Sequence, residues 1–393
     1  MKAYIVQSQR RVEPFGDHPR DCLIGNQPLA QHQEETLRAL DLEPAAIPDA
    51  SQIGDTGEHV VLRDSLFFTR ELLQEFLSRS RELRVSTVCC LKPGSATLST
   101  IVPTQEVSVH PDRVEYGLHY LPTSESAGEP HPLVLQADQF SESVRFPDHM
   151  MPGGEYRVPL TDTVLIQIDH WTNLWAANMA VLLADGARLK KAPAIRLLLV
   201  ALRARSVNRW KVLRQLNRFG RDCDIHPTAY IEGSTVGDNV KIGAGAIVRE
   251  SIIGNDSYIA NNATVELSIV GAGSTIFNGC VVQYSVLYPG ACISCRYVGL
   301  NLSGKNTFIS DGVTVSDFRF DRKCVHVLKD GMRVDSGVLL LGTCLGHDVY
   351  LGAGCILSPG RAVPNGWRII PERQRVLETF HSDGQVMGHR VVR

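Results

Sequence analysis

Residues 236–252 read VGDNVKIGAGAIVRESI, and the same pattern recurs every 17 residues in this part of the chain. Each unit divides into two hexads and a pentad, so that an aliphatic side chain returns about every six residues. The position that opens the second hexad keeps the step in Ile242, Ile259, Ile276 and Ile293. Three short strands would form one triangular coil, with the aliphatic side chains stacked inside and successive coils burying one another. We expect a left-handed parallel β-helix of hexapeptide repeats over residues 219–370.

Two further features of the repeat fit this coil. The fifth place of a hexad carries a small residue, as expected where the triangle is tight: Ala246, Ala263, Ser274 and Cys280. The second place is often glycine, which we expect to serve a sharp corner. Residues 321–337 interrupt the period and carry much charge, so they are predicted to leave the coil as an arm, with Asp330-Gly331 at its turn. The six-residue step then resumes from Leu339 to Ile369.

Length and composition bound the remaining possibilities. The chain has 393 residues, is 44% hydrophobic and carries a net charge of −2, which gives no overall sign of nucleic-acid binding. Neither a signal peptide nor a membrane-spanning stretch is evident, and ten cysteines favour reduced thiols in the cytoplasm. The lone CxxC of Cys292 and Cys295 fits either core packing or a metal site.

The first 185 residues alternate strand-like and helix-like runs. Strands are expected at 3–6, 60–62 and 85–91, and amphipathic helices at 29–40 and 69–81, the latter with Thr69 as its cap. This pattern is typical of an α/β domain. We therefore divide the chain into an α/β domain (1–185), a basic helical linker (186–218), the β-helix (219–370) and a C-terminal tail (371–393).

Three stretches of the first domain resemble sugar-1-phosphate nucleotidyltransferases. Residues 25–33 (GNQPLAQHQ) resemble the family's GxKPLLxHQ segment, and 59–67 (HVVLRDSLF) resemble ILVxNGDxLF, whose aspartate binds magnesium. Residues 171–178 (WTNLWAAN) resemble the PWDLLxAN segment that closes the domain. The resemblance implies a Rossmann-like nucleotidyltransferase domain with Asp64 in the place of the metal ligand.

The departures from that family concern its chemistry. The glycine-rich GGxGTR loop, whose amides hold the nucleotide phosphates, is replaced by QSQRRV at 7–12. The PKP lysine is missing, since 19–21 read PRD, and Arg63 replaces the glycine before Asp64. Nucleotidyl transfer depends on positioning and charge neutralisation. We therefore expect that this activity is lost, that Asp64 is vestigial and that Mg²⁺ is not bound.

The second half resembles the β-helix of bifunctional enzymes that join nucleotidyl transfer to amino-sugar acetylation. Residues 316–327 (SDFRFDRKCVHV) resemble ANLRFDxKxVKV, and 329–337 (KDGMRVDSG) resemble the xKGxRVDSG that follows it. The resemblance implies an acetyl-transfer site, with acyl-CoA as donor, in a cleft between the β-helices of a homotrimer. Trimerisation is expected from this analogy alone.

The residues of that site are only partly kept. The family's GHxxYVG segment falls on Ser294 and Tyr297, so serine replaces the histidine that acts as base, and a hydroxyl of very high pKa cannot take that role near neutral pH. The asparagine of ANLRF is Asp317, the matching lysine is Lys323, and a further lysine has become His326. Two histidines are candidate substitute bases, His326 in the arm and His347 at a corner expected to face solvent; both also fit structural roles.

Residues 188–218 belong to neither resemblance. They contain ten Lys or Arg and no acid, and a helical period from Ala194 places Ile195, Leu199, Trp210 and Leu216 on one face. One interpretation is a helix on an anionic membrane surface, which would make the protein peripheral at the inner membrane face. The other is an interdomain helix with its apolar face packed on either domain. Nucleic acid is not an expected partner.

Three functions remain open from the sequence. The first is a non-catalytic family member that binds a sugar nucleotide or a partner and acts as a regulator or scaffold. The second is an acyltransferase with an altered base. The third is a peripheral membrane protein of envelope or glycan assembly, which is compatible with either of the others.

Overall fold

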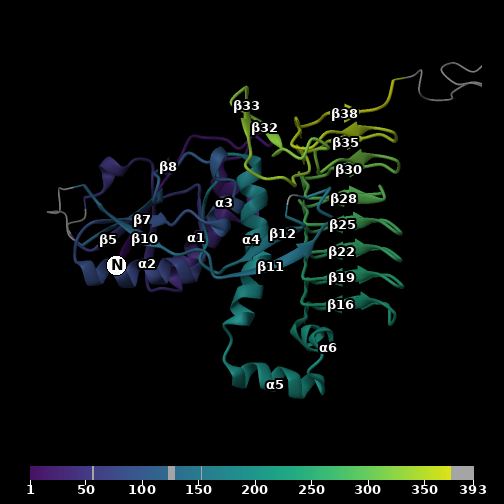
Figure 1. The fold of residues 1–393 in the computed structure, drawn as a ribbon, viewed down its shortest axis with the longest axis horizontal. Helices are drawn as coiled ribbons and strands as arrows, with labels where there is room; N and C mark the ends of the chain where they lie inside the picture. Colours follow the sequence, from purple (N-terminus) through teal and green to yellow (C-terminus); the bar gives the residue numbers. More distant parts are fainter. Residues whose placement is uncertain (55–56, 123–128, 152, 373–393) are drawn as a thin grey trace, which may run out of the picture.

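The computed structural model describes residues 1–54, 57–122, 129–151 and 153–372. An α/β domain and a tall β-helix lie side by side, and the long helix α4 (Trp171–Lys190) stands between them (Figure 1). Among the described residues, no helix combines the length and apolarity needed to span a bilayer.

The α/β domain is built on a mixed sheet with the strand order β10-β7-β9-β5-β1-β4, and β8 (Ser108–Val109) also pairs with β9. β1 pairs in parallel with β4 and β5, whereas β9 is antiparallel to β5 and β7. The bounds are β1 Lys2–Val6, β4 Glu43–Ile47, β5 His59–Arg63, β7 Thr87–Leu91, β9 Val114–Leu121 and β10 His131–Leu135. The predicted α/β class is confirmed.

Two amphipathic helices cover this sheet. α1 (Leu29–Arg38) and α2 (Arg70–Leu83) bury their apolar stripes in the core that they share with the sheet. Thr69 precedes α2 as predicted, but its hydroxyl donates to the Asp162 carbonyl instead of capping the helix.

Smaller elements complete the domain. They are the hairpin β2 (Leu23–Ile24) and β3 (Gln27–Pro28), the pair β6 (Leu66–Phe68) and β13 (Leu165–Gln167), the hairpin β11 (Phe140–Arg145) and β12 (Glu155–Leu160), and the short α3 (Ser95–Ser99).

The second half forms the predicted parallel β-helix. Two eight-stranded sheets run from β14 (Arg218–Phe219) to β37 (Ala362–Val363) and from β15 (Asp224–Ile225) to β38 (Arg368–Ile369). A third sheet runs from β16 (Tyr230–Glu232) to β28 (Tyr297–Gly299), and β31 (Thr314–Val315) pairs with β36 (Ile356–Leu357) above it. Pairs such as Ile242↔Ile259 and Ile259↔Ile276 keep the 17-residue register, and these side chains are buried in one core. The remaining strands lie between these ends, and a coil adds one strand to each sheet.

Their bounds are β17 Thr235–Val236, β18 Lys241–Ile242, β19 Ile247–Arg249, β20 Ile252–Ile253, β21 Tyr258–Ile259, β22 Thr264–Glu266, β23 Ile269–Val270, β24 Thr275–Ile276, β25 Val281–Gln283, β26 Val286–Leu287, β27 Cys292–Ile293, β29 Leu302–Ser303, β30 Phe308–Ile309, β34 Cys344–Leu345 and β35 Tyr350–Leu351.

The small residues and glycines of the repeat have separate causes. Ala246, Ala263 and Cys280 are buried in the coil core at the fifth place, as predicted. A Cβ on the second-place Gly254 would lie 2.5 Å from the backbone nitrogen of Ala272 in the next coil. The left-handed corner itself falls at the fourth place, for example at Gly273 with φ +66°. Glycine at the second place is therefore required by the close approach of the next coil. The prediction that it forms the corner is wrong, because the corner lies two residues later.

The interruption at 321–337 contains the predicted hairpin. β32 (His326–Lys329) pairs with β33 (Met332–Asp335), and Asp330 and Gly331 at its turn both have positive φ. Figure 1 shows this arm reaching back from the β-helix toward the first domain.

The basic linker is not one continuous amphipathic helix, so the single apolar face predicted up to Leu216 is wrong. α5 (Ala194–Ala204) ends at Arg205, whose φ of 48° turns the chain, and α6 (Arg209–Leu213) follows. Leu213 is buried, whereas α5 contains no buried residue. The interpretation of a packed interdomain helix is therefore contradicted for α5.

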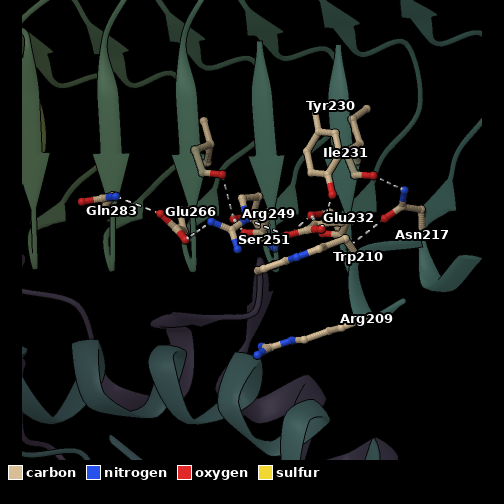
Figure 2. A network of polar contacts seen from close by, with 12 residues as sticks. Arg209, Trp210, Asn217, Tyr230, Ile231, Glu232, Arg249, Ser251, Glu266 and Gln283 are labelled. Atoms are coloured by element: carbon tan, nitrogen blue, oxygen red, sulfur yellow. Dashed lines mark hydrogen bonds and ion pairs between the residues drawn. The ribbon is translucent and has the colours of Figure 1, made fainter. Parts of the chain in front are cut away.

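A ladder of polar side chains anchors α6 to the β-helix (Figure 2). Arg249 binds the Glu232 carboxylate at 2.6 Å and that of Glu266 at 2.8 Å, on the strands on either side of it. Gln283 continues the ladder by donating to Glu266, and the Arg249 guanidinium lies over the Trp210 ring at 5.1 Å.

Candidate functional site

The turn that carries Asp64 is tightly positioned. It joins β5 to β6, and the Asp64 amide donates to the Val6 carbonyl at 3.0 Å. From α1, the Gln33 amide donates to the carbonyls of Arg63 and Leu66, which are on either side of the turn. The segment resembling the family's GxKPLLxHQ therefore holds the strand end that presents the aspartate.

Asp64 is paired with an arginine of its own chain. Arg20 Nη1 lies 3.1 Å from Asp64 Oδ2, and the Asp64 side chain is 2% exposed. Desolvation raises the pKa of Asp64, while the Ser8 amide and Arg20 act in the opposite direction. The arginine stands where sequence comparison expected the PKP lysine, but it points its charge at the carboxylate.

A second buried carboxylate, Asp169, lies in the same region and was missed by the sequence analysis. Burial raises the pKa of Asp169, and Arg10 Nη1 lies 3.8 Å from Asp169 Oδ1. Arg10 also pairs with Glu106 and, at 3.5 Å, with Asp330 at the tip of the arm. A signal was available, because Asp169 directly precedes the segment 171–178 that the resemblance had singled out.

Asp64 and Asp169 are the candidate magnesium ligands of this region. The two carboxylates that could serve as ligands, Asp64 and Asp169, each face a guanidinium group. Within the described part of the chain, no group of three His, Cys, Asp or Glu side chains is arranged to hold a metal ion. Arg20 and Arg10 place positive charge beside these two carboxylates.

The arm closes over this region from the β-helix side. His170 Nδ1 accepts from the Thr172 amide, so Nε2 donates to the Leu328 carbonyl of β32 at 3.0 Å. Burial lowers the pKa of His170 to about 4, which keeps it neutral near pH 7. Burial and Arg10 lower the pKa of Lys329, the next residue of the arm.

The two domains also share an extensive interface. The Gly25-Asn26 turn docks on α4 and the β-helix, through Asn178 and the Val270 carbonyl at 2.9 Å each. Apolar residues of both domains form one continuous cluster here: Val12, Phe15, Ile24, Trp171, Leu174, Ile269, Val286, Tyr288, Leu302 and Cys344.

At the predicted acetyl-transfer site, the structure brings Tyr297 and Asp317 together. Tyr297 Oη donates to Asp317 Oδ2 at 3.3 Å. Desolvation and the neighbouring Asp317 raise the pKa of Tyr297 to about 12, and desolvation raises the pKa of Asp317. Ser294 lies one corner earlier, half-buried, with its amide bonded to the Ile309 carbonyl.

The arm residues of that site lie close by in sequence but have other contacts. His326 Nδ1 accepts from Arg319 Nη1 at 3.2 Å, and its carbonyl accepts from Arg361. Lys323 is exposed, and its amide binds the Asp321 carboxylate.

His347 faces the first domain and not open solvent. Its Nδ1 accepts from the Lys305 amide at 2.9 Å, so Nε2 donates to Asp17 Oδ2 at 3.0 Å. Its ring also lies 5.1 Å from that of Phe15. No hydrogen bond or ion pair of the described residues joins His347 to Tyr297 or Asp317; its Nδ1 bonds within the β-helix, and its Nε2 serves the interdomain contact.

The family model that matches this chain covers part of its second half. Residues 204–298 match the family model described as the GMPPB C-terminal domain. Among solved structures, a hexapeptide transferase family protein from Anaplasma phagocytophilum is similar at 20% identity, over 38% of this chain and 76% of that one, with a TM-score of 0.20. No curated protein matched. The matched segment covers the end of the linker and the first coils of the β-helix, and over these residues the chain is similar to that family.

Proposed function

We propose that this protein has lost nucleotidyl transfer and acts as a sugar-nucleotide-binding, regulatory or scaffold protein in glycan or envelope metabolism. The observation that carries the proposal is the pairing of Asp64 with Arg20 in a buried site. An enzyme of this kind needs its carboxylates free to hold a metal and the triphosphate beside it. Here each carboxylate already faces a guanidinium group, with Arg20 Nη1 at 3.1 Å from Asp64 Oδ2 and Arg10 Nη1 at 3.8 Å from Asp169 Oδ1.

The position of the arm supports the same proposal. Its tip reaches Arg10 through Asp330, and its strand is fixed by the bond from His170 to Leu328. The region around Asp169 is thus covered by a part of the β-helix domain. Such a contact suits a protein whose two domains form one binding surface.

The direct test is an assay of the purified chain with each nucleoside triphosphate, a panel of sugar 1-phosphates and Mg²⁺. We expect no product above the level of Asp64→Asn. Turnover by the wild type that disappears in Asp64→Asn would overturn the proposal, since the carboxylate would then be functional.

Ligand binding is tested separately by thermal shift. A ligand that binds only the folded chain at one hundred times its Kd adds about 2.7 kcal/mol to the stability. We expect a nucleotide sugar to raise the melting temperature of the wild type. If all nucleotide sugars leave it unchanged, the ligand part of the proposal fails while the loss of transfer activity stands.

A second candidate is an acyltransferase that takes an acyl group from acyl-CoA to a sugar-type acceptor. The contact between Tyr297 and Asp317 and the retention of Lys323 favour it. Thiol release from acetyl-CoA and longer acyl-CoAs, with amino sugars as acceptors, tests it against a Tyr297→Phe variant. Background release by the wild type would remove this candidate.

The acyltransferase candidate also requires a homotrimer, because its cleft lies between β-helices. The first domain covers the sheet from β14 to β37, whereas Tyr258, Ile247 and Tyr350 on the other two sheets are partly exposed. We expect sedimentation to give three times the mass of one chain. A monomer at micromolar concentration would contradict both the homotrimer and the acyltransferase candidate that depends on it.

A further inference from the structure

α5 presents an apolar face that nothing in the described structure covers. The side chains of Ile195, Leu198, Leu199 and Leu202 are 54–64% exposed. At 100° per residue these four fall within one sector of the helix, while Val200, Ala201 and Ala204 lie opposite and are half-buried. The helix therefore turns these four large side chains outward, while Leu197, which is 37% exposed, lies on the opposite side with the half-buried residues.

Positive charge borders this face. Arg196 and Arg203 lie side by side, one step around the helix from Leu199, and no ion pair is found for either among the described residues. The whole stretch 188–218 contains ten Lys or Arg and no acid. Long basic side chains beside an apolar stripe extend their charges toward an anionic boundary while the stem stays among apolar groups.

The fold places this helix at one end of the molecule. Figure 1 shows α5 at the lower end of the molecule, below α4 and α6, lying across the direction in which the coils stack. An open hollow of about 600 Å³ between the end of the linker and the first coil adds Lys211, Arg214 and His226 to the same end. The anchoring of α6 through Trp210 and Arg249 keeps α5 in place (Figure 2).

We propose that α5 is a membrane-docking element that lies flat on an anionic lipid bilayer, with Ile195, Leu198, Leu199 and Leu202 among the acyl chains and Arg196 and Arg203 at the headgroups. We favour an anionic bilayer over a neutral surface because the apolar stripe lies within a stretch that is rich in basic residues and contains no acid. The helix has 11 residues, so it lies in the interface and does not cross it. The inference is independent of the activity of either domain.

The experiment is co-sedimentation of the full-length chain with vesicles of phosphatidylcholine alone or with one third phosphatidylglycerol. We expect binding to the anionic vesicles only, and weakening as salt rises. Leu198→Gln/Leu199→Gln should lower the affinity by about tenfold or more, since it removes half-exposed apolar area from the docking face. Arg196→Gln/Arg203→Gln should lower it by about fivefold for each charge removed.

Matched controls separate docking from general effects. Ile356→Gln removes a side chain that is 78% exposed on the β-helix, and Arg79→Gln removes a basic side chain on α2; both should bind as the wild type does. All changed residues are exposed, so equal melting temperatures are expected. Absence of binding to anionic vesicles at low salt would overturn the proposal. So would a change in sedimentation mass with unchanged vesicle binding in Leu198→Gln/Leu199→Gln, which would assign α5 to contact with a second copy.

Discussion

Single arginines decide the electrostatics of the first domain. Arg20 and Arg10 lie beside carboxylates that burial alone would make costly to ionise. Both arginines lie in segments where the sequence departs from the family that it resembles, but nothing local marks either as the partner of a carboxylate. Their roles depend on which carboxylate the fold brings within reach.

Replacing Arg20 by alanine should destabilise the chain by about 2 kcal/mol, because the buried Asp64 carboxylate would lose its partner. Urea unfolding monitored by circular dichroism measures this. The double change Arg20→Ala/Asp64→Asn should recover most of the loss, since the neutral amide needs no counter-charge. The exposed pair of Arg38 and Glu34 is the control, and Arg38→Ala should cost no more than about 0.5 kcal/mol. Equal losses from Arg20→Ala and the double change would contradict the pairing argument.

At the scale of elements, the β-helix is held by rows of like side chains that repeat once per coil. The core row is aliphatic, and the ladder of Figure 2 is its polar counterpart on the outer face of one sheet. Stacking at a fixed step lets each residue contact its equivalents in the two neighbouring coils.

Replacing Arg249 by methionine should break this ladder. The Glu232 side chain is fully buried and would keep only its bond from Tyr230, so we expect a loss of about 3 kcal/mol. Arg221→Met removes an 85% exposed partner of Asp238 and should cost less than about 1 kcal/mol. Denaturant midpoints of the two variants, compared at equal m-values, decide the matter. Similar midpoints would mean that the ladder contributes little.

Glycine replacements distinguish the two causes found in the repeat. Gly273→Ala adds a Cβ in open space and should cost about 1 kcal/mol for its positive φ. Gly254→Ala places a Cβ 2.5 Å from the Ala272 backbone nitrogen, so adjacent coils must separate and the loss should exceed about 2 kcal/mol. Thermal melts rank the two. A larger loss of stability for Gly273→Ala than for Gly254→Ala would show that the left-handed corner requires glycine more strongly than the close approach of the coils does.

At the scale of the whole molecule, the two domains are joined by an apolar cluster, the arm and a few polar bonds. The bond from His347 to Asp17 spans 330 positions of the chain and lies beside the Phe15 and Tyr288 rings. Loss of this bond should therefore weaken the contact between the two domains and lower the stability of the chain.

The stability that Asp17 contributes should depend on pH. The hydrogen bond from His347 lowers the pKa of Asp17 below its usual value near 3.8. A carboxyl with a lowered folded pKa stabilises the folded state above the unfolded pKa, and this contribution is lost as pH falls through the folded pKa. The melting temperature of the wild type should exceed that of Asp17→Asn at pH 6, and the difference should shrink below about pH 4. A difference that stays constant from pH 6 to pH 3 would contradict this assignment.

The sequence by itself determined the β-helix, its arm and the α/β class of the first domain. Each is written in local patterns, since a coil needs a fixed step of inward aliphatics and a strand or helix needs its own period. The sequence also singled out Asp64, Tyr297 and Asp317 as candidate site residues, because motif and spacing are local properties. Only the tertiary structure decided that Arg20 pairs with Asp64, that His347 binds Asp17 across the domain joint, and that α5 turns its leucines outward. Those outcomes depend on contacts between residues that are far apart in the sequence, and the local periodicity of the sequence does not encode such contacts.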